Sequence, residues 1–242
     1  MYTEFERILA AKELALFKKY IQKRIEGFSA AAIIGKKEFM GLTLKVNEQV
    51  LIPRPDTETW LEKVIQYYRN ETGLKVADLG TGSGAILVGF LYYCRDAVGV
   101  GVDISTEALK IAEENGQNLK ITDRVEWRQG DYLKAFDEED IFDGIFSNPP
   151  YIPTKDIGGL SREVKHEPRL ALDGGTDGLY FYHLLAKGAA EHLKPGGFLA
   201  VEFGIGQATD ILEMFRKSAQ YEDFEVIKDY GGIERALYCR KK

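Results

Sequence analysis

The chain has 242 residues, of which 45% are hydrophobic and 29% are charged. This is ordinary globular composition, and it excludes collagen-like, disordered and low-complexity classes. The formal net charge of −6 argues against direct binding to nucleic-acid backbones. Two cysteines far apart in sequence, Cys94 and Cys239, favour a reducing, cytoplasmic compartment. With neither a long apolar run nor an apolar signal core in Met1–Ala10, we expect no membrane association.

The first 55 residues differ in pattern from the rest of the chain. Apolar residues at helical spacing predict a helix over residues 3–26. From Gly41 the period changes to two, which predicts a strand at Leu42–Val46, a turn, and a second strand at Gln49–Ile52. We interpret residues 1–55 as a short helix and β-hairpin that serve as a substrate-recognition element.

Two prolines, Pro53 and Pro55, end the second predicted strand. Asp56 follows them and is placed to cap the next helix. We therefore set the boundary of the main domain, residues 56–242, at this point.

After Gly73 the chain repeats a unit of strand, glycine-containing turn and helix. Strands are predicted at Lys75–Leu79, Val98–Val102, Val125–Arg128, Ile141–Ser147 and Phe198–Phe203, and helices at Ala85–Cys94, Ser105–Asn118, Leu179–Leu193 and Gln207–Ala219. Phe224–Asp229 and Ala236–Cys239 flank a Gly-Gly turn and predict a terminal antiparallel hairpin. The alternation predicts an α/β fold with a Rossmann-like sheet of seven strands, mostly parallel, covered by helices on both faces.

A glycine-rich turn follows the first strand of this sheet. Its residues are Gly80, Thr81, Gly82, Ser83 and Gly84, directly before a helix. Glycines allow a ligand to approach the backbone, and a helix N-terminus presents free N–H groups. The spacing G-x-G-x-G differs from the dinucleotide pattern, and the turn lacks the G-K-[ST] ending of a triphosphate cradle. A tight turn without a ligand remains the alternative.

Acidic residues follow the next two strands. Asp103 lies about 20 residues after the glycine turn, where a carboxylate can accept both ribose hydroxyls of an adenosine ligand; a helix cap is the alternative. Asp131 and Tyr132 follow the third strand, where Tyr132 could stack on the base and Asp131 could approach its edge. A polar loop with an aromatic plug is the alternative there.

The sequence Asn148-Pro149-Pro150-Tyr151 follows the fourth strand. Two prolines remove two N–H donors, so carbonyl oxygens remain free to point into a pocket. The Asn148 side chain adds another oxygen and Tyr151 adds an aromatic wall. Carbonyl acceptors suit a planar NH2 group, whose lone pair is then aimed at an electrophile. A merely rigid loop is the alternative.

These motifs together resemble class I S-adenosylmethionine-dependent methyltransferases that act on amide or exocyclic amino nitrogens. Further segments resemble the HemK/PrmC-type peptide-chain release factor glutamine methyltransferases. They are Gly35–Leu42, Val50–Glu58, Ser147–Pro153, Glu167–Leu172, Gly174–Leu179 and Val201–Gly204. The resemblance extends from about Gly35 to Tyr238.

The resemblance implies a methyltransferase domain that binds S-adenosylmethionine, releases S-adenosylhomocysteine and methylates the glutamine of a Gly-Gly-Gln motif in a release factor. It implies that Asn148, Pro149 and Tyr151 are catalytic and that Asn148 also contacts the cofactor. Substrate would also contact Pro150 and the segment Pro53, Arg54 and Pro55. We expect no metal site.

Three departures from the family pattern stand out. At most one long helix precedes the hairpin, where the family usually carries a longer helical bundle. Asp56 replaces the more common Glu, and Tyr132 replaces the Trp of some members. The main alternative function is methylation of an exocyclic amino group of adenine or guanine in nucleic acid. A non-enzymatic nucleotide-binding regulator would leave Asn148–Tyr151 without a purpose.

The segment Ile152–Thr176 is long for a loop in a compact domain, which is typical of a functional segment. It carries four basic residues, Lys155, Arg162, Lys165 and Arg169. Because it follows the predicted reacting corner, we interpret it as a lid that touches the protein substrate.

Overall fold

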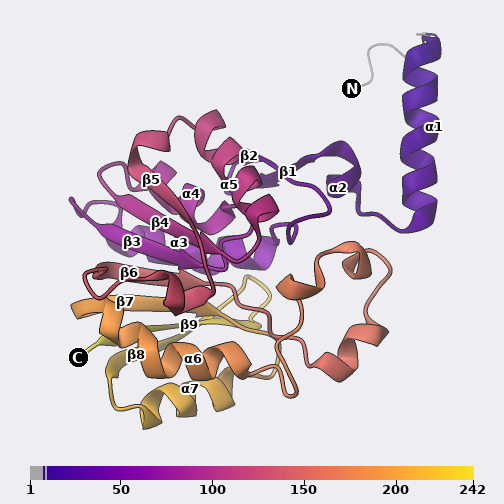
Figure 1. The fold of residues 1–242 in the computed structure, drawn as a ribbon. Coiled ribbons are helices and arrows are strands. Elements are labelled where there is room, and N and C mark those ends of the chain that lie inside the picture. Colours follow the sequence, from indigo (N-terminus) through magenta and orange to yellow (C-terminus); the bar gives the residue numbers. More distant parts are fainter. Residues whose placement is uncertain (1–7, 9) are drawn as a thin grey trace.

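The computed structural model describes residue 8 and residues 10–242. Its main feature is a seven-stranded sheet in the order β5-β4-β3-β6-β7-β9-β8 (Figure 1). The strands are β3 (Lys75–Leu79), β4 (Val98–Asp103), β5 (Val125–Gln129), β6 (Phe142–Ser147), β7 (Leu193–Glu202), β8 (Tyr221–Lys228) and β9 (Glu234–Lys241). The first five pair in parallel, whereas β9 runs antiparallel between β7 and β8. The predicted fold, including its terminal hairpin, is confirmed.

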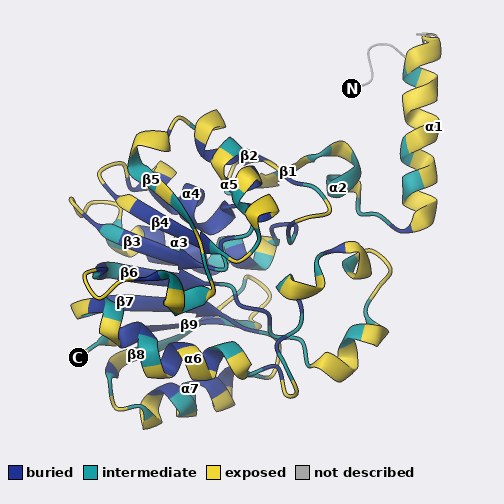
Figure 2. Ribbon diagram, in the orientation of Figure 1, coloured by how far each residue is buried: buried dark blue, intermediate teal, exposed yellow. Residues whose placement is uncertain are grey.

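Helices cover both faces of this sheet (Figure 1). On one face lie α3 (Pro55–Tyr68), α4 (Ala85–Tyr93) and α5 (Thr106–Asn118); on the other lie α6 (Tyr180–Gly188) and α7 (Ala208–Lys217). Trp60 on α3 and Tyr182 on α6 are among the largest fully buried side chains. Because the central strands are apolar on both faces, the deepest burial runs along the middle of the sheet (Figure 2).

The hairpin before α3 pairs different residues from those predicted. It consists of β1 (Lys36–Phe39) and β2 (Leu42–Lys45), not of Leu42–Val46 with Gln49–Ile52. The two-residue turn Met40-Gly41 has positive φ at both positions, which matches the twist of a tight hairpin. Three of the four β1 residues are charged, so this strand gave no alternating apolar signal.

Asn115 on α5 ties this hairpin to the main domain. Its Oδ1 accepts a hydrogen bond from the Lys45 N–H at 2.6 Å, and its Nδ2 donates to the carbonyls of Lys45 and Ser83. Phe39 and Leu44 of the hairpin are buried in the same core as α3 and α4. The hairpin is therefore packed against the edge of the glycine turn.

Two helices precede the hairpin, α1 (Ala11–Glu26) and α2 (Ala30–Ile34). Helix α1 projects away from the body of the molecule and buries none of its residues (Figures 1 and 2). The remainder of the predicted helix 3–26 lies largely outside the described residues. At the C-terminal end of α1, the Arg162 side chain donates to the Ile25 carbonyl at 3.0 Å. Just beyond this end, the His166 ring stacks on Phe28.

Helix α3 begins without the predicted Asp56 cap. Arg54 is the N-cap residue and Pro55 is the first helical residue, so Asp56 lies inside the first turn. Proline at this position loses no hydrogen bond, because the first N–H groups of a helix have no partner within it. Asp56 instead pairs with Arg235 of β9 at 2.9 Å.

The segment after β6 contains short 3₁₀ helices in place of an irregular loop. They are η3 (Thr154–Gly159), η4 (Val164–His166) and η5 (Arg169–Ala171); the remaining 3₁₀ turns are η1 (Thr122–Arg124), η2 (Tyr132–Ala135) and η6 (Ala189–His192). An isolated bridge between Ile152 and Asp173 closes the base of the segment. Within the described part of the chain, no helix has the length and apolarity that a bilayer crossing needs.

Candidate active site

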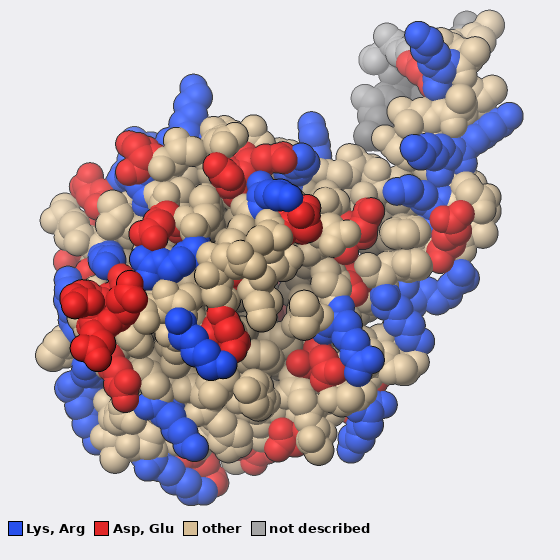
Figure 3. Space-filling model, in the orientation of Figure 1, with Lys and Arg blue, Asp and Glu red and all other residues tan. Residues whose placement is uncertain are grey.

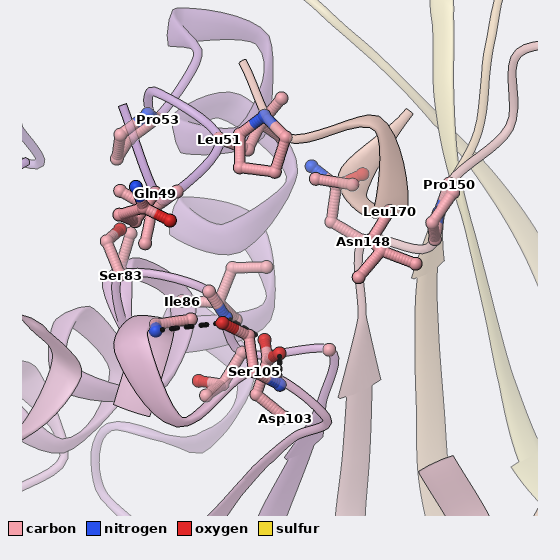
Figure 4. Close-up of a pocket in the computed structure, with 18 of the residues that line it drawn as sticks. Gln49, Leu51, Pro53, Ser83, Ile86, Asp103, Ser105, Asn148, Pro150 and Leu170 are labelled. Carbon is pink, nitrogen blue, oxygen red and sulfur yellow. Dashed lines mark hydrogen bonds between the residues drawn. The ribbon is translucent and has the colours of Figure 1, made fainter. Parts of the chain in front are cut away.

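A cavity lies at the carboxyl ends of β3, β4 and β6, where parallel α/β sheets bind their ligands. Figure 4 shows Gln49, Leu51 and Pro53 on one side of it, Asn148, Pro150 and Leu170 on another, and Ser83, Ile86, Asp103 and Ser105 below. Ten of the predicted site residues line this cavity: Pro53, Arg54, Gly80, Thr81, Gly82, Ser83, Asp103, Tyr132, Asn148 and Pro150. The sheet thus brings together predicted site residues that are far apart in sequence, from Pro53 to Pro150.

The glycine turn crosses the end of β4. The N–H groups of Gly80 and Thr81 both donate to the Val102 carbonyl at 2.9 Å. Gly80 and Gly82 have positive φ, which L side chains rarely adopt, and a Cβ on Gly80 would lie 2.9 Å from the Tyr132 hydroxyl. Backbone therefore forms this wall of the cavity, open to close approach by a ligand.

The Asp103 carboxylate joins the glycine turn to the start of α5. Its Oδ2 accepts from the Gly82 N–H at 2.8 Å, and its Oδ1 accepts from the Ser105 N–H at 2.9 Å. A carboxylate has about four acceptor positions, so each oxygen keeps capacity for another donor. Burial raises the pKa of Asp103, and the two backbone hydrogen bonds oppose this rise.

Behind the glycine turn lies a second carboxyl group, that of Asp78. It is fully buried, and the Thr81 hydroxyl donates to its Oδ2 at 2.6 Å. Its Oδ1 has no hydrogen-bond partner among the described residues. Burial raises the pKa of Asp78 to about 7. In the described part of the chain, no three His, Cys, Asp or Glu side chains are grouped as a metal site requires.

Of the two residues predicted to contact the base, Tyr132 lines the cavity and Asp131 does not. The Tyr132 ring stacks on Phe181 of α6, with ring centroids 4.6 Å apart. Burial raises the pKa of its hydroxyl far above the ordinary range. Asp131 is exposed, pairs with Lys134 at 2.5 Å, and is absent from the cavity lining.

Asn148 lies at the end of β6, between two cavities. It lines the first cavity and also a second one, which Leu51, Tyr151, Leu160 and Val164 line as well. The Asn148 Oδ1 is buried and has no donor among the described residues. A buried acceptor without a partner costs about 1–3 kcal/mol, so this oxygen is poised for a donor that comes from elsewhere.

The remaining predicted residues lie around these two cavities. Tyr151 lines only the second cavity, and burial raises the pKa of its hydroxyl to about 12. Gly84 is the N-cap of α4 and Pro55 starts α3, so both shape elements next to the site. Pro149 is buried, and its side chain lines neither cavity.

Two basic residues of the predicted lid are engaged within the chain. Arg169 pairs with Asp173 at 3.0 Å, and Arg162 contacts the end of α1. The face in Figure 3 carries acidic and basic side chains interspersed, with several lysines on α1.

Several site residues escaped the sequence reasoning. Leu170 and the apolar segment Val50–Leu51 line the main cavity, but neither carries a polar group that would mark it. Glu202 ends β7 and accepts hydrogen bonds from Thr57 and Trp60. It lies beside Asn148, because Ser147 of β6 pairs with Val201 of β7. Glu202 lies in Val201–Gly204, one of the segments that carry the family resemblance, but no pattern in the sequence indicated a role for it.

Comparison with solved structures defines the class. The chain resembles a methyltransferase from Pyrococcus furiosus, with a TM-score of 0.59 and 20% identity over 96% of this chain and 99% of the other. It also resembles a 16S ribosomal RNA methyltransferase from Thermus thermophilus, solved with AdoMet and guanosine, with a TM-score of 0.60 and 19% identity over 86% of this chain and 50% of the other. A family model described as a methyltransferase domain matches residues 70–220. The fold is that of the class I methyltransferases.

Sequence relatives narrow this class. A release factor glutamine methyltransferase from Bradyrhizobium diazoefficiens is 43% identical over 97% of this chain and 80% of its own length. One from Moorella thermoacetica is 39% identical over 100% of this chain and 85% of its own length. This chain belongs to the release factor glutamine methyltransferase family.

Proposed function

We propose that the protein transfers a methyl group from S-adenosylmethionine to the side-chain amide nitrogen of the glutamine in the Gly-Gly-Gln motif of a peptide-chain release factor. The observation that carries this proposal is the buried Oδ1 of Asn148, which accepts no hydrogen bond from any described residue and belongs to a side chain that lines both cavities. One cavity suits the cofactor, and the other suits an incoming glutamine side chain.

The main cavity fits the cofactor by its donor and acceptor groups. Asp103 has free acceptor positions for two ribose hydroxyls, and the turn Gly80–Gly82 exposes backbone to the rest of the ligand. Tyr132 and Ile104 border the same cavity and offer apolar surface for a base. When bound, S-adenosylmethionine supplies a methyl group activated by the neighbouring sulfonium.

An amide nitrogen is a weak nucleophile, so the task of the protein is to position it. The Asn148 Oδ1 and the Pro149 carbonyl oxygen would accept the two amide hydrogens. These acceptors would also stabilise the positive charge that develops on the nitrogen. The methylated amide cation is strongly acidic and loses its proton readily, so no dedicated base is needed.

The walls of the second cavity would hold the glutamine side chain and exclude water. Tyr151, Leu51 and Arg54 all line this cavity. Pro53 and Pro150 border the adjoining cofactor cavity. Residues 1–55 would serve recognition and residues 56–242 the transfer itself.

The proposal places the enzyme in the cytoplasm, with a release factor as its protein partner. Its two cysteines, Cys94 and Cys239, are free and buried, which fits a reducing compartment. Burial raises the pKa of the Cys94 thiol to about 11, so this group stays protonated and unreactive.

The test is transfer of labelled methyl from S-adenosylmethionine to purified release factor, run beside RNA and DNA. We expect label on the release factor glutamine and none on nucleic acid. A release factor whose motif glutamine is replaced by alanine serves as the matched control. Label on an adenine or guanine amino group would establish the alternative function instead.

A further inference from the structure

Glu202 is a buried carboxylate without a cationic partner among the described residues. Its side chain ends β7 with 3% of the residue exposed. The Thr57 hydroxyl and the Trp60 indole N–H both donate to its Oε2, at 2.6 and 2.7 Å. Tyr182 donates to its backbone carbonyl at 2.9 Å. These contacts hold the residue firmly between α3 and α6.

Such a group is costly to bury. An unpaired carboxylate in a low-dielectric interior loses its hydration, and here burial raises the pKa of Glu202 while the negative Asp56 raises it further. Thr57 and Trp60 by themselves need only one neutral acceptor oxygen. The ionisable group therefore calls for an explanation beyond joining α3 to the sheet.

Asn148 supplies that explanation. Strands β6 and β7 pair in parallel with Ser147 beside Val201, so the next residues, Asn148 and Glu202, lie side by side. Against the effect of burial, a side-chain hydrogen bond with Asn148 lowers the pKa of Glu202. Both Thr57 and Trp60 donate to Oε2, so neither of them occupies Oε1. In its ionised form the Glu202 carboxylate only accepts hydrogen bonds, so it then admits the amide with its NH2 group facing Glu202. The Asn148 Oδ1 then faces away from Glu202, and this oxygen accepts no hydrogen bond from the residues that the structure describes.

We propose that Glu202 is a positioning residue that selects one of the two orientations of the Asn148 amide. In the selected orientation an acceptor faces the substrate nitrogen. In the flipped orientation an NH2 group would meet the two amide hydrogens of the substrate, donor against donor. This inference rests on the proposed function and adds to it the group that sets the acceptor.

The charge of Glu202 is essential to this role. A neutral glutamine has nearly the same shape, and it offers both a donor and an acceptor. With Glu202→Gln, Oε1 can still accept from Thr57 and Trp60, which directs the new NH2 group toward Asn148. The Asn148 oxygen would then turn to this donor and leave the substrate.

The test measures kcat, KM for release factor and cofactor affinity in Glu202→Gln. We expect kcat to fall about tenfold to a hundredfold, less than on loss of the acceptor itself. Cofactor affinity and Tm should change little. The matched control is Glu225→Gln on β8, because Glu225 also accepts from two α3 side chains, Lys63 and Tyr67, far from the site. The control should retain wild-type kcat.

A double-mutant cycle separates positioning from general support of the fold. If Glu202 acts through Asn148, Glu202→Gln should cost almost nothing further in an Asn148→Ala background. The same loss in both backgrounds would overturn the inference. Should Glu202→Gln fold poorly, Thr57→Val provides the second variant: it removes one donor to Oε2, and its smaller kcat loss must also vanish in the Asn148→Ala background.

The outcomes distinguish the two proposals. An enzyme that methylates release factor, loses activity in Asn148→Ala and keeps wild-type kcat in Glu202→Gln would refute the role of Glu202 alone. A wild-type enzyme that transfers no methyl to release factor would refute the proposed function itself.

Discussion

Arg54 and Glu167 are 113 residues apart in sequence and form an ion pair beside the candidate active site, in which the carboxylate is buried. The Arg54 Nη2 donates to both carboxylate oxygens of Glu167, at 2.8 and 2.7 Å. The Glu167 side chain is 5% exposed and that of Arg54 is 33% exposed. The pair joins the segment before α3 to the predicted lid that follows β6, so it holds both walls of the candidate site together.

This pair predicts unequal effects of two substitutions. Arg54→Met leaves the Glu167 carboxylate buried without its cation, so we expect a loss of about 1–3 kcal/mol in the free energy of unfolding. Glu167→Gln removes the charge that is costly to bury, so its free energy of unfolding should fall clearly less than that of Arg54→Met. Urea unfolding of both variants measures the difference. Equal losses would mean that the burial of Glu167 carries no cost that Arg54 relieves.

Asp103→Ala tests the proposed ribose site. The substitution removes two ribose hydrogen bonds to a charged acceptor, worth about 1.5–3 kcal/mol each, together with the contact that braces the Gly82 N–H. We expect S-adenosylmethionine binding to be lost or greatly weakened in calorimetry. The control is Glu107→Gln, an exposed α5 residue paired with Lys110. Unchanged affinity in Asp103→Ala would remove this residue from the site.

Asn148 is the residue on which the proposed chemistry depends most. Asn148→Ala removes one amide acceptor and leaves the glycine turn intact, so cofactor affinity should fall modestly while kcat falls about 10²–10³-fold. Asn148→Asp keeps the size but places a carboxylate beside the buried Glu202. We expect it to bind cofactor and to turn over slowly. Near-normal turnover by either variant would show that other groups orient the amide.

Deleting Met1–Gly27 tests the role of the projecting helix. Helix α1 buries no residue, and its end contacts the lid through Arg24–Glu163 and Arg162. We expect the shortened chain to fold and to bind cofactor with unchanged affinity, with a higher KM for release factor. Loss of folding or of cofactor binding would show that α1 belongs to the core.

The pKa of Asp78 predicts how stability changes with pH. Burial raises this pKa from 3.8 to about 7, so between these values the folded chain holds a proton that the unfolded chain has lost. The free energy of unfolding therefore falls as the pH rises through this range. Asp78→Asn cannot ionise and removes this contribution. Between pH 5 and pH 8 we expect the variant to gain about 2.5 kcal/mol relative to wild type in cofactor-free urea unfolding. Parallel pH curves would contradict the assignment.

Local patterns along the chain predicted most of the fold. The central strand Lys75–Leu79 is recognisable as a short, nearly continuous apolar run, and the helix at Thr106–Asn118 by the helical period of its apolar residues. The glycine turn, Asp103 and Asn148 each follow a strand, and parallel strands bring their carboxyl ends to one edge. Their meeting in one cavity followed from the order of motifs alone.

The hairpin was misplaced because its first strand has no alternating apolar pattern. Lys36–Glu38 is charged, and only the pairing with Leu42–Lys45 and the turn at Met40-Gly41 define it. The prediction that Asp56 caps α3 was wrong for a related reason. Helix α3 begins at Pro55, so Asp56 lies inside its first turn. The Asp56 carboxylate pairs instead with Arg235, which lies far away in the sequence.

What only the tertiary structure decided are the contacts between polar groups far apart in sequence. No spacing in the chain predicts the contacts of Arg54 with Glu167, or those of Glu202 with Thr57 and Trp60. A buried charge or amide must find its partner within about 3 Å, and that distance depends on how whole elements pack. The sequence by itself therefore determined which motifs stand at the edge of the sheet, whereas the packing of α3 and the lid against that edge decided which way their polar atoms face.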